Sequence, residues 1–226
     1  MCELVIFDCD GVLVDSEPIS IAVLREVIAG AGLEIGEDVA YRRFLGRSMS
    51  TIAKLLEDEF GLTMTDGHLA EVRGRLYERF RRELKAIPGI ADAVEALTAP
   101  FCVASSSQPE RIRLSLSVTG LLEKFEPRIY SSTMVENGKP APDLFLHAAH
   151  AMGVEPAGCV VVEDSAAGIE AAGRAGMTVF AFTGGAHAAH CGLHDTAAAL
   201  HPHLIFDDMR QLPALLAAYG SGKKAP

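Results

Sequence analysis

Short, uninterrupted apolar runs recur along this chain, and amphipathic stretches with helical spacing separate most of them. Apolar and polar residues do not alternate within these runs, which is typical of strands that are covered on both faces. Repeated βαβ units predict a parallel sheet between two layers of helices, the arrangement of α/β proteins. In such folds ligands bind beyond the carboxyl ends of the strands. We expect strands at residues 4–7, 101–104, 159–162, 178–182 and 204–206.

Residues 16–87 interrupt this alternation, because they contain several helical patterns but no convincing strand. Turn-forming residues at 15–18 and at 87–89 mark the two edges of the interval and predict flexible links there. We therefore predict a core built from residues 1–15 and 88–226, with a helical domain of residues 16–87 inserted into it. Two helical faces are predicted in the insertion, one with Ile52, Leu55, Leu56 and Phe60, the other with Leu69, Val72, Leu76, Phe80 and Leu84.

The chain is acidic, since 30 Asp and Glu against 20 Lys and Arg give a formal net charge of −10 over 226 residues. An acidic surface repels a phosphate backbone, so we expect no nucleic-acid partner. No apolar run is long enough to cross a membrane, and the first residues do not have the pattern of a secretory signal. We therefore expect a cytoplasmic protein without a membrane partner, and a monomer.

The cysteines and histidines do not form a convincing metal-binding pattern. The five cysteines show no CxxC spacing, so we expect reduced, mostly buried thiols. His190 and His194 have the spacing of a helical zinc pair, but Gly192 between them favours a solvated loop. We expect the tail, residues 220–226, to be frayed.

Two carboxylates follow the first predicted strand, Asp8 and, two residues later, Asp10. Alternation along an extended chain places both on the same side, with Cys9 pointing away. A divalent cation would relieve their mutual repulsion, and carboxylate oxygens suit magnesium. Taken alone, this pattern more often marks a strand that runs into a polar loop. The metal-binding interpretation becomes stronger when the polar segments after the later strands are considered with it.

Three serines, at 105, 106 and 107, follow the second predicted strand. Ser107 and Glu110 have the spacing of a capping box, which predicts that a helix begins at Ser107. Free N–H groups and a hydroxyl at a helix start can hold phosphate oxygens. Ser105 and the amide of Ser106 are therefore candidates for phosphate binding.

Three charged residues complete the pattern. Lys139 lies in a short loop that two prolines stiffen, where it could neutralise an anion bound beside the first carboxylates. Glu163 and Asp164 directly follow the predicted strand 159–162. The carboxyl ends of parallel strands meet at one edge, so these two acids are further candidate metal ligands.

Together these segments resemble, in order, the four motifs of the haloacid dehalogenase superfamily of phosphohydrolases. The helical insertion is similar to the small α-helical cap of that superfamily, and the resemblance spans roughly residues 4–185. It implies a Rossmann-like (HAD-like) core with an inserted cap. Within the superfamily the chain resembles the β-phosphoglucomutase-like branch, and stretches such as 84–89, 97–103 and 148–152 are similar to bacterial 6-phosphogluconate phosphatases. The motifs are Asp8-Cys9-Asp10-Gly11-Val12, Val103-Ala104-Ser105, Lys139-Pro140 and Glu163-Asp164-Ser165-Ala166-Ala167-Gly168.

The resemblance implies a covalent mechanism. Asp8 would be the nucleophile that takes the phosphoryl group as an aspartyl-phosphate. Asp10 would protonate the leaving alcohol and then deprotonate the attacking water. Magnesium would be held by the Asp8 carboxylate, the Asp10 backbone carbonyl and Asp164, with Glu163 bound to it or beside it. Ser105, the Ser106 amide and Lys139 would bind the phosphoryl oxygens.

The inserted cap is expected to choose the substrate by closing over the site. Arg47 follows Gly46 in what resembles the specificity loop of the family, and an arginine there would suit a carboxylate or a second anionic group. Glu17 is a further candidate for substrate binding. Arg42 and Arg43 are equally typical of a solvated surface.

We predict a magnesium-dependent phosphatase for a small phosphorylated metabolite, a sugar or sugar-acid phosphate such as 6-phosphogluconate. Asp10 disfavours a dehalogenase, because halide leaves without protonation. A phosphomutase is the nearest alternative, but mutases that resemble this chain carry a cap histidine at about Ser20. A phospho-accepting receiver module is an alternative of another class, although it would need only about half this length and no cap.

Overall fold

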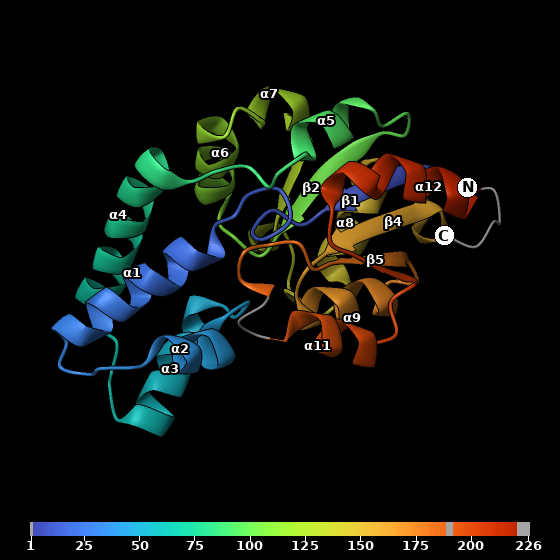
Figure 1. Cartoon of the computed structure of the whole chain (residues 1–226). Helices are drawn as coiled ribbons and strands as arrows, with labels where there is room; N and C mark the ends of the chain where they lie inside the picture. Colours follow the sequence, from blue (N-terminus) through green and yellow to red (C-terminus); the bar gives the residue numbers. More distant parts are fainter. Residues whose placement is uncertain (1, 189–191, 221–226) are drawn as a thin grey trace.

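The computed structural model describes residues 2–188 and 192–220. Within them the chain forms a six-stranded parallel sheet in the order β3-β2-β1-β4-β5-β6 (Figure 1). The five predicted strands are confirmed. The strands are β1 Leu4–Phe7, β2 Phe101–Ser105, β3 Ile129–Ser131, β4 Cys159–Glu163, β5 Thr178–Phe182 and β6 Leu204–Phe206.

The edge strand β3 is absent from the sequence prediction. It has three residues and pairs with β2, where Ser131 lies opposite Ser105. Its sequence, Ile129-Tyr130-Ser131, holds one aliphatic residue and does not stand out as an apolar run, unlike Leu204–Phe206. This strand nevertheless supports the loop after β2, because Ser131 Oγ donates a hydrogen bond to the Ser107 carbonyl at 2.7 Å.

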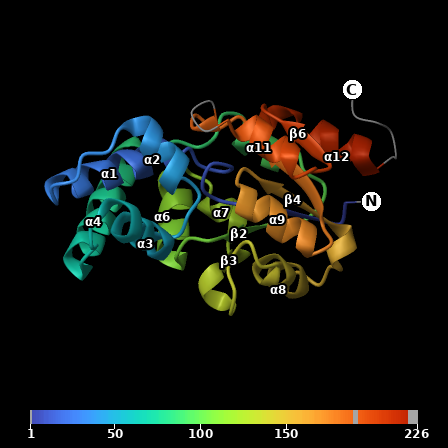
Figure 2. The ribbon, with the colours of Figure 1, turned by 90° about the horizontal axis from the view of Figure 1, so that it is seen from below.

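Helices cover both faces of the sheet, as the composition of the strands predicts (Figure 2). Side chains such as Phe7 and Val162 pack on one face, and Ile6 and Val161 on the other. The first face is covered by α5 Ile90–Glu95, α6 Pro109–Val118, α7 Leu122–Phe125 and α12 Leu212–Gly220, and the second by α8 Asp143–Ala151, α9 Ala166–Arg174 and α11 Leu193–Ala199. Short 3-10 helices lie at η1 Ser132–Met134, η2 Pro156–Gly158 and η3 Met209–Gln211.

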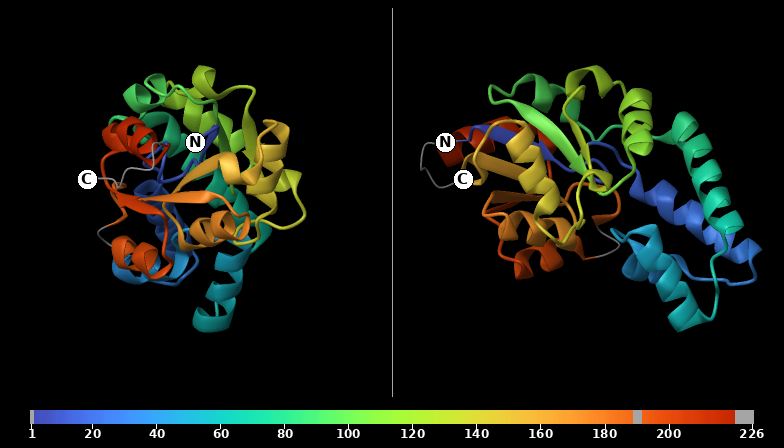
Figure 3. Two further views of the ribbon diagram at one scale, coloured as in Figure 1. Left: turned by 90° about the vertical axis from the view of Figure 1, so that its right-hand side faces the viewer. Right: turned by 180° about the vertical axis from the view of Figure 1, so that it is seen from behind.

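The helices between residues 17 and 83, which we call the helical segment, stand beyond the carboxyl ends of the strands (Figures 1 and 3). They contain the two predicted apolar faces, since Ile52 and Leu56 are buried in one helix and Val72, Leu76 and Phe80 in another. In the right panel of Figure 3 the helices Glu17–Gly30 and Asp66–Glu83 lie side by side. The helices of this segment are α1 Glu17–Gly30, α2 Glu37–Phe44, α3 Met49–Phe60 and α4 Asp66–Glu83.

Two backbone links join the helical segment to the sheet, and they are hydrogen-bonded to each other. The Asp15 N–H donates to the Lys85 carbonyl at 2.9 Å, and the Ile87 N–H donates to the Leu13 carbonyl at 3.0 Å. Val14 pairs with Ala86 in an antiparallel bridge. The helical segment is therefore attached through one short two-stranded ribbon.

Other predictions are tested in part. No helix in the described part of the chain is long and apolar enough to cross a membrane. Cys2, Cys9, Cys102 and Cys159 are free thiols, and the last three are buried. His194 is exposed on α11, whereas His190, Cys191 and the tail 221–226 lie outside the described residues.

Candidate active site

Asp8 follows β1, one of the two central strands, and is only 7% exposed. The Nζ of Lys139 donates a hydrogen bond to Asp8 Oδ1 at 2.6 Å and to Glu163 Oε1 at 2.7 Å. Burial opposes the charge of Lys139, but the two carboxylates raise its pKa above the usual value. A charged lysine therefore joins the end of β1 to the end of β4.

Glu163 is almost completely buried and uses both carboxylate oxygens. Besides Lys139, it accepts hydrogen bonds from the Ser165 N–H at 2.7 Å and from Ser165 Oγ at 3.0 Å. A Cβ at Gly168 would lie 1.7 Å from Glu163 Oε1, so the start of α9 approaches this carboxylate as closely as a glycine permits. The geometry favours Glu163 as the group that holds Lys139, beside the predicted metal.

The carboxylate of Asp10 accepts three hydrogen bonds. Ser16 Oγ donates to Oδ1 at 2.7 Å, Ser107 Oγ to Oδ2 at 2.6 Å, and Arg111 Nη2 to Oδ1 at 2.8 Å. Burial would raise the pKa of Asp10, but Arg111 and the two hydroxyls outweigh it and lower the pKa below the usual value. In this conformation Asp10 is a carboxylate with a fixed orientation.

The predicted capping role of Ser107 is wrong. Helix α6 begins at Pro109 after Gln108, and no side chain caps it. Proline at the first helical position has no N–H to satisfy. The Ser107 hydroxyl donates to Asp10 instead, because a hydrogen bond to a carboxylate is stronger than one between neutral groups.

The two serines predicted to hold phosphate lie at the same edge of the sheet. Ser105 ends β2, is 1% exposed, and its Oγ accepts a hydrogen bond from the Ser107 N–H at 3.1 Å. Ser106 is exposed, and its carbonyl accepts from Ser132 Oγ at 2.9 Å. The loop after β2 is thus held by its neighbours, with Ser105 on the strand next to Asp8.

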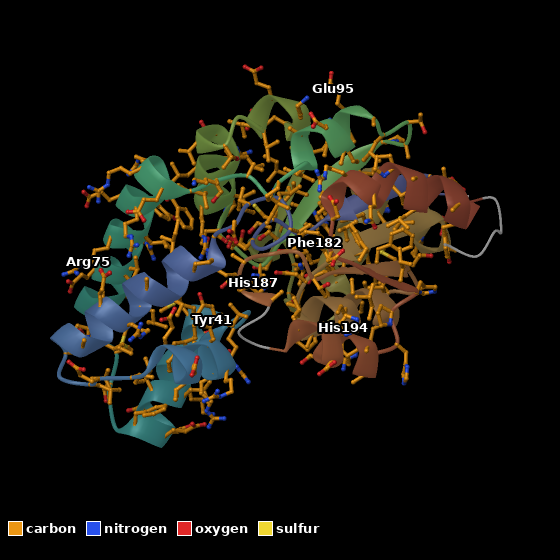
Figure 4. The ribbon with its side chains drawn as sticks, in the orientation of Figure 1. Tyr41, Arg75, Glu95, Phe182, His187 and His194 are labelled. Atoms are coloured by element: carbon orange, nitrogen blue, oxygen red, sulfur yellow. The ribbon has the colours of Figure 1, made fainter. Side chains whose placement is uncertain are left out.

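Asp164 follows β4 and pairs with a histidine that the sequence analysis missed. The Nε2 of His187 lies 3.1 Å from Asp164 Oδ2. Burial raises the pKa of Asp164 although His187 lowers it, and Asp164 raises the pKa of His187 although burial lowers it. His187 comes from the loop after β5, and Figure 4 shows it between the sheet and the helical segment. Gly11 packs against this pair, since a Cβ there would lie 1.8 Å from Asp164 Oδ2.

The donor set fits magnesium. Burial, and then Glu163, Asp164 and Asp10, raise the pKa of Asp8 although Lys139 lowers it, so this group of side chains carries excess negative charge. A divalent cation between Asp8 and Asp164 would compensate that charge with hard oxygen ligands. Within the described ranges no three His, Cys, Asp or Glu side chains form a ready ligand cluster. The predicted site therefore depends on two carboxylates and the Asp10 backbone carbonyl.

The helical segment contributes less defined groups. Glu17 begins α1, and burial, followed by Asp10, raises its pKa to about 7. Arg47 is exposed, and a Cβ at the preceding Gly46 would lie 3.6 Å from the Cβ of Ser165, so this loop reaches the start of α9. Arg42 and Arg43 are exposed, and Arg43 pairs with Glu59 at the surface.

Arg111 and Ser16 also escaped the sequence analysis. Both bond to Asp10, but Arg111 lies in the first turn of α6 and Ser16 precedes α1, outside every recognised motif. The sequence offers no signal that singles out Arg111, because Arg113 stands on the same helix two residues later.

The chain matches known proteins along almost its whole length. A family model of haloacid dehalogenase-like hydrolases matches residues 2–176. The 6-phosphogluconate phosphatase of Escherichia coli K12 is 33% identical over 220 residues, which are 96% of each chain. A haloacid dehalogenase-like protein of Agrobacterium tumefaciens C58 is 37% identical, with a TM-score of 0.85 over 97% of this chain and 100% of that one. A Thermotoga maritima protein assigned as a β-phosphoglucomutase is 25% identical, with a TM-score of 0.73 over 95% and 98%.

Proposed function

Because the chain belongs to the haloacid dehalogenase-like hydrolase family, we propose that it is a magnesium-dependent phosphatase acting on a small sugar or sugar-acid phosphate through an aspartyl-phosphate. That it is a phosphoric monoester hydrolase follows from its family and its phosphatase relatives. One observation carries the proposal furthest. A buried carboxylate, Asp8, lies at the centre of the sheet edge in contact with the charged Lys139.

In the first step an oxygen of Asp8 attacks the phosphorus atom, and the bond from phosphorus to the sugar oxygen breaks. The leaving oxygen takes a proton from Asp10. Lys139 lies 2.6 Å from Asp8, where its charge can stabilise the phosphoryl oxygens. Ser105 and the Ser106 amide bind those oxygens from the loop after β2.

In the second step a water molecule attacks the phosphorus of the aspartyl-phosphate. Asp10 takes a proton from that water, and Asp8 is released as a carboxylate together with inorganic phosphate. The same group thus gives and recovers one proton in each cycle. Arg111, Ser16 and Ser107 donate hydrogen bonds to Asp10 and favour its ionised form, which is the form that accepts the proton of the second step.

Asp8, Asp164 and the Asp10 carbonyl would hold magnesium, which supplies positive charge to the transferring phosphoryl group. Glu163 keeps Lys139 in place, and His187 fixes the orientation of Asp164. Residues 16–87 would act as a cap that excludes water and contacts the leaving alcohol.

The substrate class rests on the relatives. The curated relative that covers 96% of this chain is named a 6-phosphogluconate phosphatase. Arg111, which pairs with Asp10, suits an anionic sugar, and Arg47 on the exposed loop after Gly46 is a further candidate.

A phosphomutase is the second candidate, because a structural relative is assigned as a β-phosphoglucomutase. Ser20 stands near the position where related mutases carry a histidine. Its hydroxyl donates to the Ser16 carbonyl at 3.0 Å and cannot transfer a proton near neutral pH as an imidazole does. This difference favours water as the phosphoryl acceptor.

The test is phosphate release from 6-phosphogluconate, glucose 6-phosphate and β-glucose 1-phosphate, with magnesium and then with excess chelator. We expect release that is fastest from 6-phosphogluconate and lost with chelator. Conversion of β-glucose 1-phosphate to glucose 6-phosphate without release would identify a mutase. Release that chelator does not change would contradict the metal requirement.

A further inference from the structure

We propose that Arg111 binds a carboxylate on the leaving alcohol, so that the enzyme selects phosphates of sugar acids over phosphates of uncharged sugars. This inference rests on the proposed phosphatase function and assigns the selectivity to the core helix α6. The sequence analysis assigned it to Arg47 in the helical segment.

Arg111 lies beside the group proposed to act on the leaving oxygen. The Nη2 of Arg111 lies 2.8 Å from Asp10 Oδ1, and Asp10 is the group proposed to protonate the leaving oxygen. The same nitrogen lies 3.4 Å from Ser20 Oγ in α1. The guanidinium therefore stands where the core and the helical segment meet beside the leaving alcohol.

The Arg111 guanidinium is held in place on two sides. The Cζ of Arg111 lies 5.3 Å from the centre of the Phe80 ring in α4, and the Arg111 side chain is 22% exposed. Burial opposes the charge of Arg111, but Asp10 and Glu17 raise its pKa above the usual value. A charged guanidinium held by an aromatic ring and a carboxylate loses little freedom when an anion binds.

The Arg111 guanidinium also has unused hydrogen-bonding capacity. A guanidinium has five N–H donors in a planar fork. Its bonds to described residues come from Nη2, while Nε is buried without an acceptor among them. Nη1 donates no hydrogen bond to a described residue either. A carboxylate beside Nη1 would take a free donor of the fork.

Two acidic residues, Asp10 and Glu17, lie near Arg111. Acidic neighbours disfavour the dianion of a second phosphate group more than they disfavour a monoanion. Arg47, in contrast, is exposed on its loop, where water screens its charge. A carboxylate at Arg111 is therefore the better match.

The experiment compares two open-chain substrates, 6-phosphogluconate and glucitol 6-phosphate, which differ only in the carboxylate at C1. We expect the wild type to prefer the acid by at least about tenfold in kcat/KM, as one buried charge-assisted hydrogen bond allows. Arg111→Met should reduce this ratio to about one. Losing the contact to Asp10 slows both substrates together, so the ratio isolates carboxylate recognition. Arg111→Lys, which keeps the charge without the fork, should give an intermediate ratio.

Arg113→Met is the matched control. Arg113 lies on the same helix, is exposed and pairs with Glu126 at 2.9 Å, so its removal should leave the ratio unchanged. A ratio that collapses in Arg47→Met but survives in Arg111→Met overturns the inference. A wild type that hydrolyses both substrates equally also overturns it, while leaving the phosphatase function intact.

A binding readout separates this inference from turnover. Gluconate, the product, should raise the Tm of the wild type more than glucitol does, and this difference should vanish in Arg111→Met. If the wild type releases no phosphate from any sugar phosphate, the proposed function fails, yet the gluconate shift still tests Arg111. Equal shifts with gluconate and glucitol would refute carboxylate recognition.

Discussion

The carboxyl edge of the sheet and the helical segment face each other across the site, but they hold their charged side chains differently. At the sheet edge the side chains of Lys139 and Glu163 are 4% and 1% exposed and bond to each other. In α4, Arg75 pairs with Glu71 at the surface, where the two side chains are 49% and 42% exposed. Figure 4 shows Arg75 on the outer side of the helical segment.

Burial, rather than the types of the two residues, decides how much the loss of an ion pair changes stability. An exposed ion pair contributes about 0–1 kcal/mol because solvent screens it. Breaking a buried pair costs about 3–5 kcal/mol, since it leaves an uncompensated charge without water. We expect substitutions of buried charged groups at the sheet edge to have large effects, and substitutions of exposed charges in the helical segment to have small ones.

The largest effect should come from Asp8→Asn. The amide cannot attack phosphorus, so kcat should fall by at least about 10³-fold. Burial raises the pKa of Asp8 in the folded protein, so removing its charge should not lower the Tm. Phosphate release and thermal unfolding measure the two quantities. An Asp8→Asn protein with the wild-type rate would end the assignment of the nucleophile.

Next in size is Lys139→Met, compared with Lys124→Met. Removal of Lys139 leaves Asp8 and Glu163 without their cation and should lower the free energy of unfolding by about 3 kcal/mol. Lys124 pairs with Glu95 at 3.5 Å on the surface, so its loss should cost less than about 1 kcal/mol. Urea unfolding of both variants measures the difference. Equal losses would break the comparison between the two regions.

A smaller effect is expected from Arg47→Met in the helical segment. The side chain is exposed, so stability should stay within about 0.5 kcal/mol of the wild type. KM for 6-phosphogluconate should rise by less than about tenfold, because water screens the charge. Steady-state kinetics with a parallel melting curve checks both values. A large fall in kcat would instead show that Arg47 acts in the chemical step as well as in substrate binding.

The smallest effect concerns the pH dependence of Glu17. Its pKa is raised from 4.5 to about 7, mainly by burial, so the folded state favours the protonated acid. The stabilisation it gives is complete below about pH 4.5 and is lost as the pH rises through about 7. Relative to Glu17→Gln, the wild type should lose on the order of 1 kcal/mol between pH 5 and 8. If the difference in stability between the wild type and Glu17→Gln stays constant from pH 5 to pH 8, the raised pKa of Glu17 is contradicted.

Most of the residues that sequence reasoning could bring together lie at the carboxyl end of a strand. Lys139, which comes from a loop beyond β3, is an exception. Asp8, Ser105 and Glu163 come directly at or after β1, β2 and β4, and a parallel sheet gathers such positions at one edge. Their proximity follows from topology alone, before any side chain is placed.

The rest depends on how separate elements pack. Arg111 meets Asp10 because α6 lies against α4, where Phe80 supports the guanidinium. His187 reaches Asp164 only because its loop folds back toward Gly11. No local pattern of the sequence encodes these contacts, and the strand β3, with its mixed sequence Ile129-Tyr130-Ser131, has no apolar run. The Ser107 prediction failed because a tertiary partner, Asp10, replaced the local one.

Gly11 and Gly168 are positions at which the structure leaves no room for a side chain. Any β-carbon at position 11 would collide with Asp164, and any at position 168 would collide with Glu163. A mutational library aimed at new substrates should therefore leave these two positions unvaried. Gly46 should also stay a glycine, because its φ of 66° lies in the left-handed region, so the diversity belongs at neighbouring loop positions such as Arg47. In laboratory evolution the chemistry would then be inherited unchanged while the choice of substrate is selected.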